Sequence, residues 1–488
     1  MRRIFGAIGV GLALLGACGK SFTTPQAVQG PEAGAGGASD AGSAGSAPVG
    51  AQGGEAASGA PALGGADAGE SAGGTPGAGE GGAGGAPIDD WNVAGDDAGG
   101  APSAGPVTGK IELQLRPAPG AIVRIDGDSK LTEEDGSFTF DDVAAEYDLT
   151  VIYEPGREAK VIEGLTTRQP VVVLGNAEAN RSAVVAGKLS GGAGFPLPAG
   201  HDASVAVVFP ATVVGFGQKA RLADQATSYL LQNVDWLGPQ SIEGELVALQ
   251  WQNGFTGPRA FTGFARKPLT LTGGVAIGDA NGSVEATNLA LDTQPAVSSY
   301  DGTLSSADPY DDFIPLLEVG PFAFGFANGV GSFSVLTPEI DLPTGIDVLA
   351  VRDVSDQMYI YVPKPAPGEK WRVSVPKLPS LVVPQAAAKV TVATAFEWES
   401  MPKHAVAHSS WFIDDWNIER VTRSTSTTIP DLTADGVPKI FPAVTWFLDA
   451  IGPADKPEQS LALQARLLRR QPVRHFNTYV VRVVELVE

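Results

Sequence analysis

Cysteine and histidine are almost absent from this sequence, which has one cysteine and four histidines among 488 residues. A single cysteine cannot form an intramolecular disulfide, so the fold has to be stabilised by packing. So few histidines leave few ways to build a Ser-His-Asp, Cys-His or histidine-rich zinc site. Counting does not exclude a glycosidase pair of carboxylates, but no motif supports one. We therefore assign no catalytic residue, no metal ligand and no cofactor, and expect a protein that is not an enzyme.

Positive charge is also scarce. Lys and Arg together number 33 against 55 Asp and Glu, and the formal net charge is −22. Nucleic-acid binding depends on clustered Lys and Arg that displace the counterions of the phosphates. The composition therefore excludes nucleic acid as an expected partner.

The longest apolar run lies at the N-terminus. Arg2 and Arg3 precede an apolar stretch from Ile4 to Leu15. A short positive segment, an apolar segment and small residues before a cleavage point are typical of a secretory signal peptide. The stretch is too short to remain as a membrane-spanning helix. We expect residues 1–17 to be removed on export.

The residues at the predicted cleavage point carry a more specific signal. Leu15-Gly16-Ala17-Cys18 resembles the lipobox of bacterial lipoproteins. That resemblance implies cleavage before Cys18 and a lipid on its sulfur, so that acyl chains anchor the protein in a membrane. Gly19 follows the cysteine rather than Asp, and the resemblance then implies the outer membrane of a Gram-negative cell envelope. The leaflet that the protein faces stays open.

Aromatic and β-branched residues are nearly missing between the anchor and residue 105. The segment 18–105 is dominated by Gly, Ala, Ser and Pro, and such a composition cannot bury enough apolar surface to offset its ordering entropy. We predict a disordered linker. Gly69–Gly73 matches the G-x-S-x-G pattern and Gly77–Gly82 matches G-x-G-x-x-G, but neither has the preceding strand and following helix that the chemistry requires.

The pattern changes to alternating apolar and polar residues in the segment 106–178, with Pro-Gly and Asp-Gly turns, which predicts antiparallel strands. The segment resembles the carboxypeptidase regulatory-like domain, whose fold is a transthyretin-like β-sandwich related to starch-binding domains. The resemblance is carried by Pro119-Gly120, Asp135-Gly136-x-Phe138-x-Phe140 and Tyr147-x-Leu149-x-Val151. It implies an accessory module without catalytic residues.

One predicted hairpin of this module, residues 126–135, is rich in acids. They are Asp126, Asp128, Glu133, Glu134 and Asp135. Their oxygens could bind calcium, but Lys130 and Leu131 break the EF-hand spacing. A solvated turn is the favoured interpretation, and calcium binding is the alternative left open.

Short strands at intervals of about ten residues continue through the segment 179–385, which predicts one or two further sandwiches. Phe322, Phe324 and Phe326, followed by Asn328-Gly329 and a strand through Phe333, predict a hairpin with one aromatic face. Such a face could stack on sugars, but core packing is the favoured interpretation.

The last segment, 386–488, resembles a fibronectin type III or immunoglobulin-like sandwich. Aromatic strands around Trp398, Trp411 and Trp446 carry the resemblance. A short helix is predicted over residues 461–468 and a final strand over residues 479–487.

Two clusters in this segment are candidate sites. His404 and His408 have the spacing of a helical metal pair, but the flanking pattern predicts strand, in which the two would lie too far apart. The basic cluster comprises Arg466, Arg469, Arg470, Arg474 and His475. It is interpreted as a solvated helix face, with docking to acidic polysaccharide or lipid headgroups as the alternative.

The sequence therefore predicts an all-β protein: tandem antiparallel sandwiches behind a lipid anchor and a long linker. No residue is assigned to ligand binding. We expect a surface protein that acts by binding or adhesion, with carbohydrate as the favoured ligand, and the alternative is a scaffold that contacts other envelope proteins. Exposed Trp or Tyr would favour the first, and a contiguous apolar patch the second.

Overall fold

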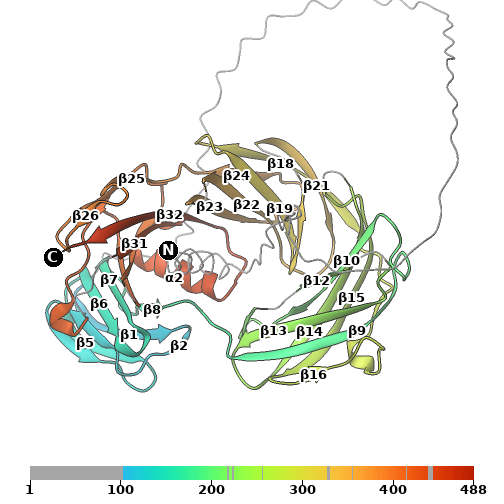
Figure 1. Ribbon diagram of the computed structural model, residues 1–488, viewed down its shortest axis with the longest axis horizontal. Coiled ribbons are helices and arrows are strands. Elements are labelled where there is room, and N and C mark those ends of the chain that lie inside the picture. The colour runs from blue at the N-terminus through green and yellow to red at the C-terminus, as the bar shows by residue number, and fades with distance from the viewer. Residues whose placement is uncertain are drawn as a thin grey trace, which may run out of the picture. The chain divides into compact units, whose positions relative to one another are not determined.

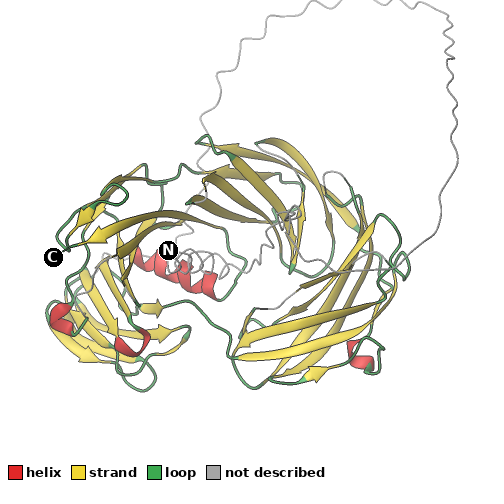
Figure 2. Cartoon of the chain, in the orientation of Figure 1, coloured by secondary structure: helices red, strands yellow, loops and turns green. Residues whose placement is uncertain are grey.

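A computed structural model of the chain describes residues 103–487 apart from 217–218, 223–224, 255–256, 327–329, 354, 414 and 438–442. The fold is all-β, as predicted, with strands arranged in antiparallel sandwiches (Figures 1 and 2). No helix of the described ranges is long and apolar enough to cross a bilayer.

Residues 105–174 pack around one core. Their elements are β1 (Gly105–Leu113), β2 (Arg116–Pro117), β3 (Ile122–Ile125), β4 (Asp128–Leu131), β5 (Ser137–Val143), β6 (Tyr147–Tyr153), η1 (Glu154–Gly156), β7 (Glu158–Leu165) and β8 (Val171–Leu174). β1 pairs antiparallel with β5 and parallel with β8, while β3, β6 and β7 belong to another sheet. Alternate side chains of β1 and β5, such as Val107, Ile111 and Phe138, enter the core between the sheets.

The predicted Asp135-Gly136 turn is confirmed. Gly136 has a φ of +78°, and a Cβ on it would lie 2.4 Å from the carbonyl oxygen of Ile111. The Gly136 amide donates to the Glu133 carbonyl over 2.9 Å, which closes the turn before β5. Glycine is required here by the backbone conformation and by the close approach of β1.

Residues 181–291 form two sheets with a core between them. The elements are β9 (Arg181–Gly191), β10 (His201–Val208), β11 (Val214–Gly215), β12 (Lys219–Leu222), β13 (Ser228–Leu237), β14 (Ser241–Gln252), β15 (Ala260–Thr272), β16 (Ala276–Ile277), η2 (Glu285–Thr287) and β17 (Leu289–Leu291). One sheet has the order β12-β10-β14-β15, and in the other β13 and β16 flank β9. Six successive residues are buried in β10, as expected when both faces of a strand are covered.

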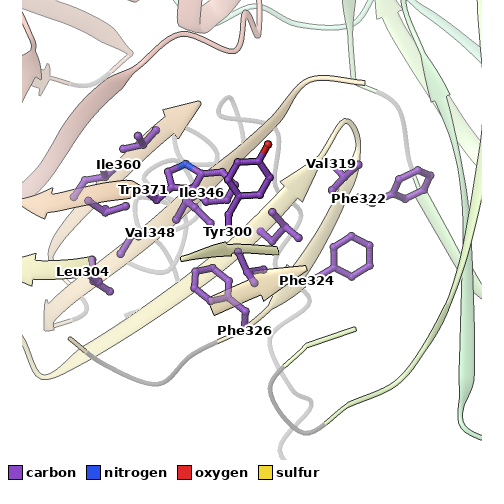
Figure 3. Close-up of a cluster of buried hydrophobic side chains, with 14 of the residues drawn as sticks. Tyr300, Leu304, Val319, Phe322, Phe324, Phe326, Ile346, Val348, Ile360 and Trp371 are labelled. Carbon is purple, nitrogen blue, oxygen red and sulfur yellow. The ribbon is translucent and has the colours of Figure 1, made fainter. Parts of the chain in front are cut away.

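The next core belongs to residues 297–375. The strands are β18 (Val297–Ser306), β19 (Asp312–Val319), β20 (Phe322–Gly325), β21 (Gly331–Pro338), β22 (Thr344–Asp353), β23 (Asp356–Pro363) and β24 (Trp371–Val375). Figure 3 shows part of this core, in which the rings of Tyr300 and Trp371 are 5.3 Å apart. The same cluster includes Val247 and Leu249 of β14, so β14 contributes to the cores on both of its faces.

The C-terminal segment surrounds four buried tryptophans. Its elements are β25 (Ser380–Val383), β26 (Lys389–Val390), β27 (Phe396–Glu399), β28 (Val406–Ile413), β29 (Trp416–Thr422), β30 (Ser426–Thr427), η3 (Thr433–Asp435), β31 (Ala443–Gly452), α2 (Pro457–Leu468) and β32 (His475–Leu486). The predicted helix and final strand are both confirmed. Trp398, Trp411, Trp416 and Trp446 lie in one core.

The two ends of the described chain share a sheet. Its strand order is β20-β19-β22-β23-β32-β31-β28-β29-β7-β6-β3-β4. β29 pairs in parallel with β7, with Asn417 opposite Glu158 and Val421 opposite Ile162. Residues about 260 positions apart are therefore hydrogen-bonded neighbours. The predicted boundaries after residues 178 and 385, and the two family resemblances, stay predictions.

The predicted hairpin through Phe322 and Phe333 is wrong. β20 pairs with β19, and β21 pairs with β18 on another sheet. Phe322, Phe324 and Phe326 all enter the same core (Figure 3). Burial of these rings therefore outweighs pairing of β20 with the next strand, β21. Their interpretation as core residues is confirmed.

Candidate functional site: a polar cleft at one end of a buried sheet

The residues of the predicted anchor lie outside the described part of the chain. This holds for Cys18, for the signal peptide 1–17, and for the linker up to residue 102. Lipidation of Cys18 therefore stays a prediction, as does disorder of the linker.

The acids of residues 126–135 do not share one hairpin, because Asp126 lies in the turn between β3 and β4, whereas Glu133 to Asp135 lie in the turn before β5, which pairs with β1. In this second turn Asp135 has a structural role. Its carboxylate accepts the Ser137 amide over 2.9 Å and lies 3.3 Å from the Lys110 ammonium. The hydrogen bonds from Ser137, assisted by Lys110, lower the pKa of Asp135 to about 2. Within the described ranges, no three His, Cys, Asp or Glu side chains are placed to hold one metal ion.

The two histidines of the predicted strand have separate partners. His404 lies before β28 and its Nδ1 is 2.8 Å from Asp455, whereas His408 is buried within β28. His408 Nδ1 is 2.5 Å from Glu419 Oε1, and its Nε2 is 3.0 Å from Ser460 Oγ. The strand predicted at His408 is confirmed, and the structure does not direct the two rings at a common point.

Glu419 extends this arrangement into a charged network that the sequence did not reveal. Its second oxygen is 2.9 Å from Lys160 Nζ, which also donates to Gln464 Oε1 over 3.0 Å and to the Val173 carbonyl over 3.2 Å. Lys160 is 1% exposed. Burial favours the neutral acid, but Lys160 and His408 hold the pKa of Glu419 far below its usual range. The network therefore joins β7, β28, β29 and α2 at the junction between the two ends of the chain.

Ser460, His408 and Glu419 have the connectivity of a Ser-His-acid triad, but the surroundings exclude that chemistry. Ser460 is 0% exposed and its hydroxyl donates to the Pro457 carbonyl over 2.8 Å. Burial also lowers the pKa of His408. A nucleophile has to reach its substrate, and this hydroxyl lies on the buried face of α2. The network therefore has a structural role and stabilises the junction between the two ends of the chain.

The basic cluster on and after α2 is only partly the solvated face that was predicted. Arg466 is exposed, but Arg469 donates to Glu112 over 2.9 Å. The Arg470 guanidinium lies 4.4 Å from the ring centre of Phe216, and His475 stacks on Tyr361. The prediction is wrong for these three residues, because they contact residues that are distant in the sequence.

Exposed aromatic rings are missing from the described part of the chain. Its tryptophans are at most 8% exposed, and its exposed large apolar side chains are valines and leucines, led by Leu131 at 64%. A sheet face that stacks aromatic rings on a polysaccharide is therefore not present among these residues. One candidate that remains is a cleft with an aromatic edge.

This cleft lies at one end of the sheet β12-β10-β14-β15. Across β10 and β14, Ala206 pairs with Val247, Ser204 with Leu249, and Asp202 with Trp251. Paired residues share a face of the sheet. This face is apolar and buried in the core at Val247, and it is polar near Asp202. Sequence alternation could not identify this change, because β10 and β14 are buried on both faces.

Strand β20 forms the opposite wall of the cleft. The Phe324 ring is 4.9 Å from Trp251 and 5.7 Å from Phe261, which holds the wall against the sheet. Gly325 lines the opening, and a Cβ on it would meet nothing within 4 Å. The cleft is partly open to solvent, and its volume is about 250 Å³. This is slightly below the range of about 300–1,000 Å³ that is usual for ligand pockets.

Hydrogen-bonding groups converge on the cleft. The residues that bring these groups to the cleft are Asp202, Ser204, Lys219, Arg221, Trp251 and Asn253. The Trp251 indole donates to Asn253 Oδ1 over 3.0 Å. Arg221 forms an ion pair with Asp202. An aromatic edge beside amide, hydroxyl and charged groups can bind a compact polar ligand with one apolar side.

Comparisons with known proteins give little beyond the fold. No family model and no curated protein matches the chain. Among solved structures, the TIE protein of Bacillus anthracis aligns with 56% of this chain at 10% identity and a TM-score of 0.14, and the alignment spans half of that protein's chain.

Two more solved structures align at similar levels. BcpA, the major pilin subunit of Bacillus cereus, aligns with 56% of this chain and 99% of its own, at 10% identity and a TM-score of 0.11. The pilus adhesin SpaC from Lactobacillus rhamnosus GG aligns with 65% of this chain and 42% of its own, at 7% identity and a TM-score of 0.13. Likeness at these scores supports no statement about a shared function.

Proposed function

We propose that this protein is an exported lipoprotein, anchored through Cys18, whose all-β head binds carbohydrate at the cell surface without catalysis. The observation that carries the binding role is the cleft, where Trp251 adjoins Asp202, Arg221 and Asn253. The lipobox resemblance supports the anchor and the outer membrane. The triad-like arrangement of Ser460, His408 and Glu419 is buried, which supports a structural rather than a catalytic role for it.

The binding role is tested by adding a side chain at the rim of the cleft. Gly325→Leu places a side chain where no atom lies within 4 Å, at a strand position whose φ is not positive. The mature chain in detergent is applied to immobilised polysaccharides, and Gly325→Leu is expected to abolish retention while the melting temperature is unchanged. Ser332→Leu is the matched control, because Ser332 is exposed on β21 outside the cleft. Equal retention of the wild type and Gly325→Leu would exclude the cleft as the site.

The anchor is tested separately from binding. Cys18→Ala removes the thiol that would carry the lipid, so the protein is expected to move from the membrane fraction to the soluble exported fraction. Intact mass of the wild type is expected to show diacylglyceryl modification of the mature N-terminus. An unmodified wild-type chain in the membrane fraction would exclude lipid anchoring through Cys18.

A scaffolding role is the second candidate, and the edge strand β4 favours it. All four residues of β4 are exposed, β3 is its partner in the described sheet, and Leu131 projects from it. Open edges can pair with a strand of another protein. Leu131→Lys would then reduce crosslinking to envelope proteins and leave polysaccharide retention unchanged, whereas Gly325→Leu would have the opposite effects.

A further inference from the structure

The long strand β32 changes partners along one of its edges. This edge pairs antiparallel with β23 as far as Val480, which lies opposite Asp356, and it pairs in parallel with β26 from Glu485, which lies opposite Lys389. On the other edge, β31 covers the same part of β32. The ladder on the first edge is therefore interrupted over residues 481–484.

Two turns flank this interruption. Beside β23, the Ser355 carbonyl accepts from the Val481 amide over 3.1 Å, whereas the Ser355 amide donates to Asp353 Oδ1 over 2.7 Å. Beside β26, the Ala387 amide donates to the Val483 carbonyl over 2.9 Å, and Ala387 has a φ of +58°. A residue other than glycine is strained in this left-handed region, and such strain is concentrated at functional sites.

The interruption leaves one backbone acceptor and one backbone donor. The amide and the carbonyl of a strand residue point to the same edge. Because the Val481 amide and the Val483 carbonyl face this edge, the Val481 carbonyl and the Val483 amide face it too. Neither has a backbone partner within the described part of the chain. An extended segment from outside can donate to the first and accept from the second, as an added strand does.

A second cleft opens over this stretch of β32. It is lined by residues 480–483, by the turn between β22 and β23, and by Leu381, Ala386 and Ala387. Its volume is about 740 Å³, which lies within the range of about 300–1,000 Å³ that is usual for ligand pockets. Val483 is 53% exposed in this cleft. The cleft therefore combines apolar side chains with the two backbone groups.

The charged groups of this second cleft are engaged by protein groups. Arg352 forms an ion pair with Asp356 over 2.6 Å, and Arg482 donates to two backbone carbonyls over 2.7 and 2.9 Å. Asp353 accepts from the amide and the hydroxyl of Ser355. Two cations thus face two acids, and no aromatic ring is among the described residues of the lining. Neither a charged ligand nor a stacked sugar ring suits these walls.

We propose that this second cleft binds an extended, uncharged peptide segment of another protein, which adds to β32 between β23 and β26. Its backbone bonds to the Val481 carbonyl and the Val483 amide, and an apolar side chain packs against Leu381 and Val483. Main-chain hydrogen bonds supply affinity in this mode of binding, and the pocket selects the side chain. The site is separate from the cleft at Trp251, and a peptide ligand goes beyond the carbohydrate proposed there.

The test measures peptide binding and backbone protection. The mature chain in detergent is applied to an immobilised array of short uncharged peptides with blocked ends, in which apolar residues alternate with Ser or Thr. At least one peptide is expected to be retained, and N-methylation of one of its backbone amides should weaken binding about tenfold or more. Retention of no peptide would overturn the proposal.

Hydrogen–deuterium exchange resolved to single amides locates the peptide on β32. The Val483 amide is expected to exchange quickly in the free chain, because it has no partner there, and slowly when the retained peptide is bound. A Val483 amide that is already protected in the free chain would overturn the proposal. So would an exchange rate that the bound peptide does not change.

Matched variants complete the test. Val483→Lys places a charge on the apolar wall and should weaken peptide binding about tenfold or more. Val297→Lys alters a valine of similar exposure, 48%, at the start of β18 outside the cleft, and should change binding less than about twofold. Circular dichroism melting separates lost binding from lost folding. Peptide binding that survives in Val483→Lys but is lost in Leu131→Lys would place the peptide at the edge of β4 and overturn the site on β32.

Discussion

The molecule uses ion pairs in two contrasting regions. At the junction between β7 and β29, Lys160 and Glu419 are almost completely buried and their hydrogen bonds go to other protein groups. At the cleft, Arg221 is largely exposed although Asp202 is nearly covered. Both regions join strands through opposite charges, but only the second leaves donors in contact with solvent. Ligand binding is therefore expected where the pair is half open, and structural stabilisation where it is closed.

The largest effect is expected from breaking the buried pair. Lys160→Met leaves the Glu419 charge without its cation in a dry environment, which should lower the free energy of unfolding by about 3–5 kcal/mol. Urea denaturation of the full chain measures this. In the double variant Lys160→Met/Glu419→Gln both charges are gone, so its loss should be smaller than the sum of the two single losses. Additive losses of the free energy of unfolding would contradict a stabilising interaction between Lys160 and Glu419.

A smaller effect is expected at Asp449, the residue opposite His408 on β31. Its Oδ1 is shielded from solvent without a hydrogen-bond partner in the described structure, and burial raises the pKa of Asp449 well above its usual value. Above about pH 4 the unfolded chain releases this proton while the folded chain keeps it, so the carboxyl costs stability as pH rises.

Asp449→Asn should remove that cost. We expect it to raise the free energy of unfolding by about 1 kcal/mol at pH 7 and to leave it nearly unchanged at pH 3.5. Thermal melts at both pH values measure the difference. Destabilisation by Asp449→Asn at pH 7 would show that the ionised carboxylate is stabilising, and would contradict the direction of the pKa shift.

The smallest effect on stability is expected at the exposed pair. Arg221→Gln should change the free energy of unfolding by less than about 0.5 kcal/mol, because solvent competes for both charges. Denaturation and polymer binding are measured on the same preparation. A stability loss close to that of Lys160→Met would remove the distinction between the two regions.

Periodicity predicted much of the architecture because it reports local structure. The alternation around Phe138 and Tyr147 and the Asp135-Gly136 turn each define a strand or turn within a few residues. The helix over residues 461–468 was predictable for the same reason, although it begins at Pro457. The false hairpin at Phe322 shows the limit, since two adjacent strands can each prefer a distant partner.

The sites could not be predicted because they are assembled from distant residues. Lys160 and Glu419 are neighbours only because β7 pairs with β29, and the cleft exists only where β20 meets Trp251. The basic cluster illustrates the same point, because Glu112 and Phe216 convert exposed arginines into contacts between segments. An individual Lys or Arg in the sequence carries no sign of which of these environments it enters.

The parallel pairing of β1 with β8 has a mechanical consequence. The linker enters β1 at its first residue, and the rest of the head follows from the last residue of β8. If the head binds a polymer and is anchored through Cys18 as proposed, a pull on the polymer draws the two strands along each other in opposite directions. The four registered pairs from Lys110–Val171 to Leu113–Leu174 then bear the load together in shear rather than opening one after another. Under flow, the attachment lifetime would be governed by the unfolding rate of this short ladder.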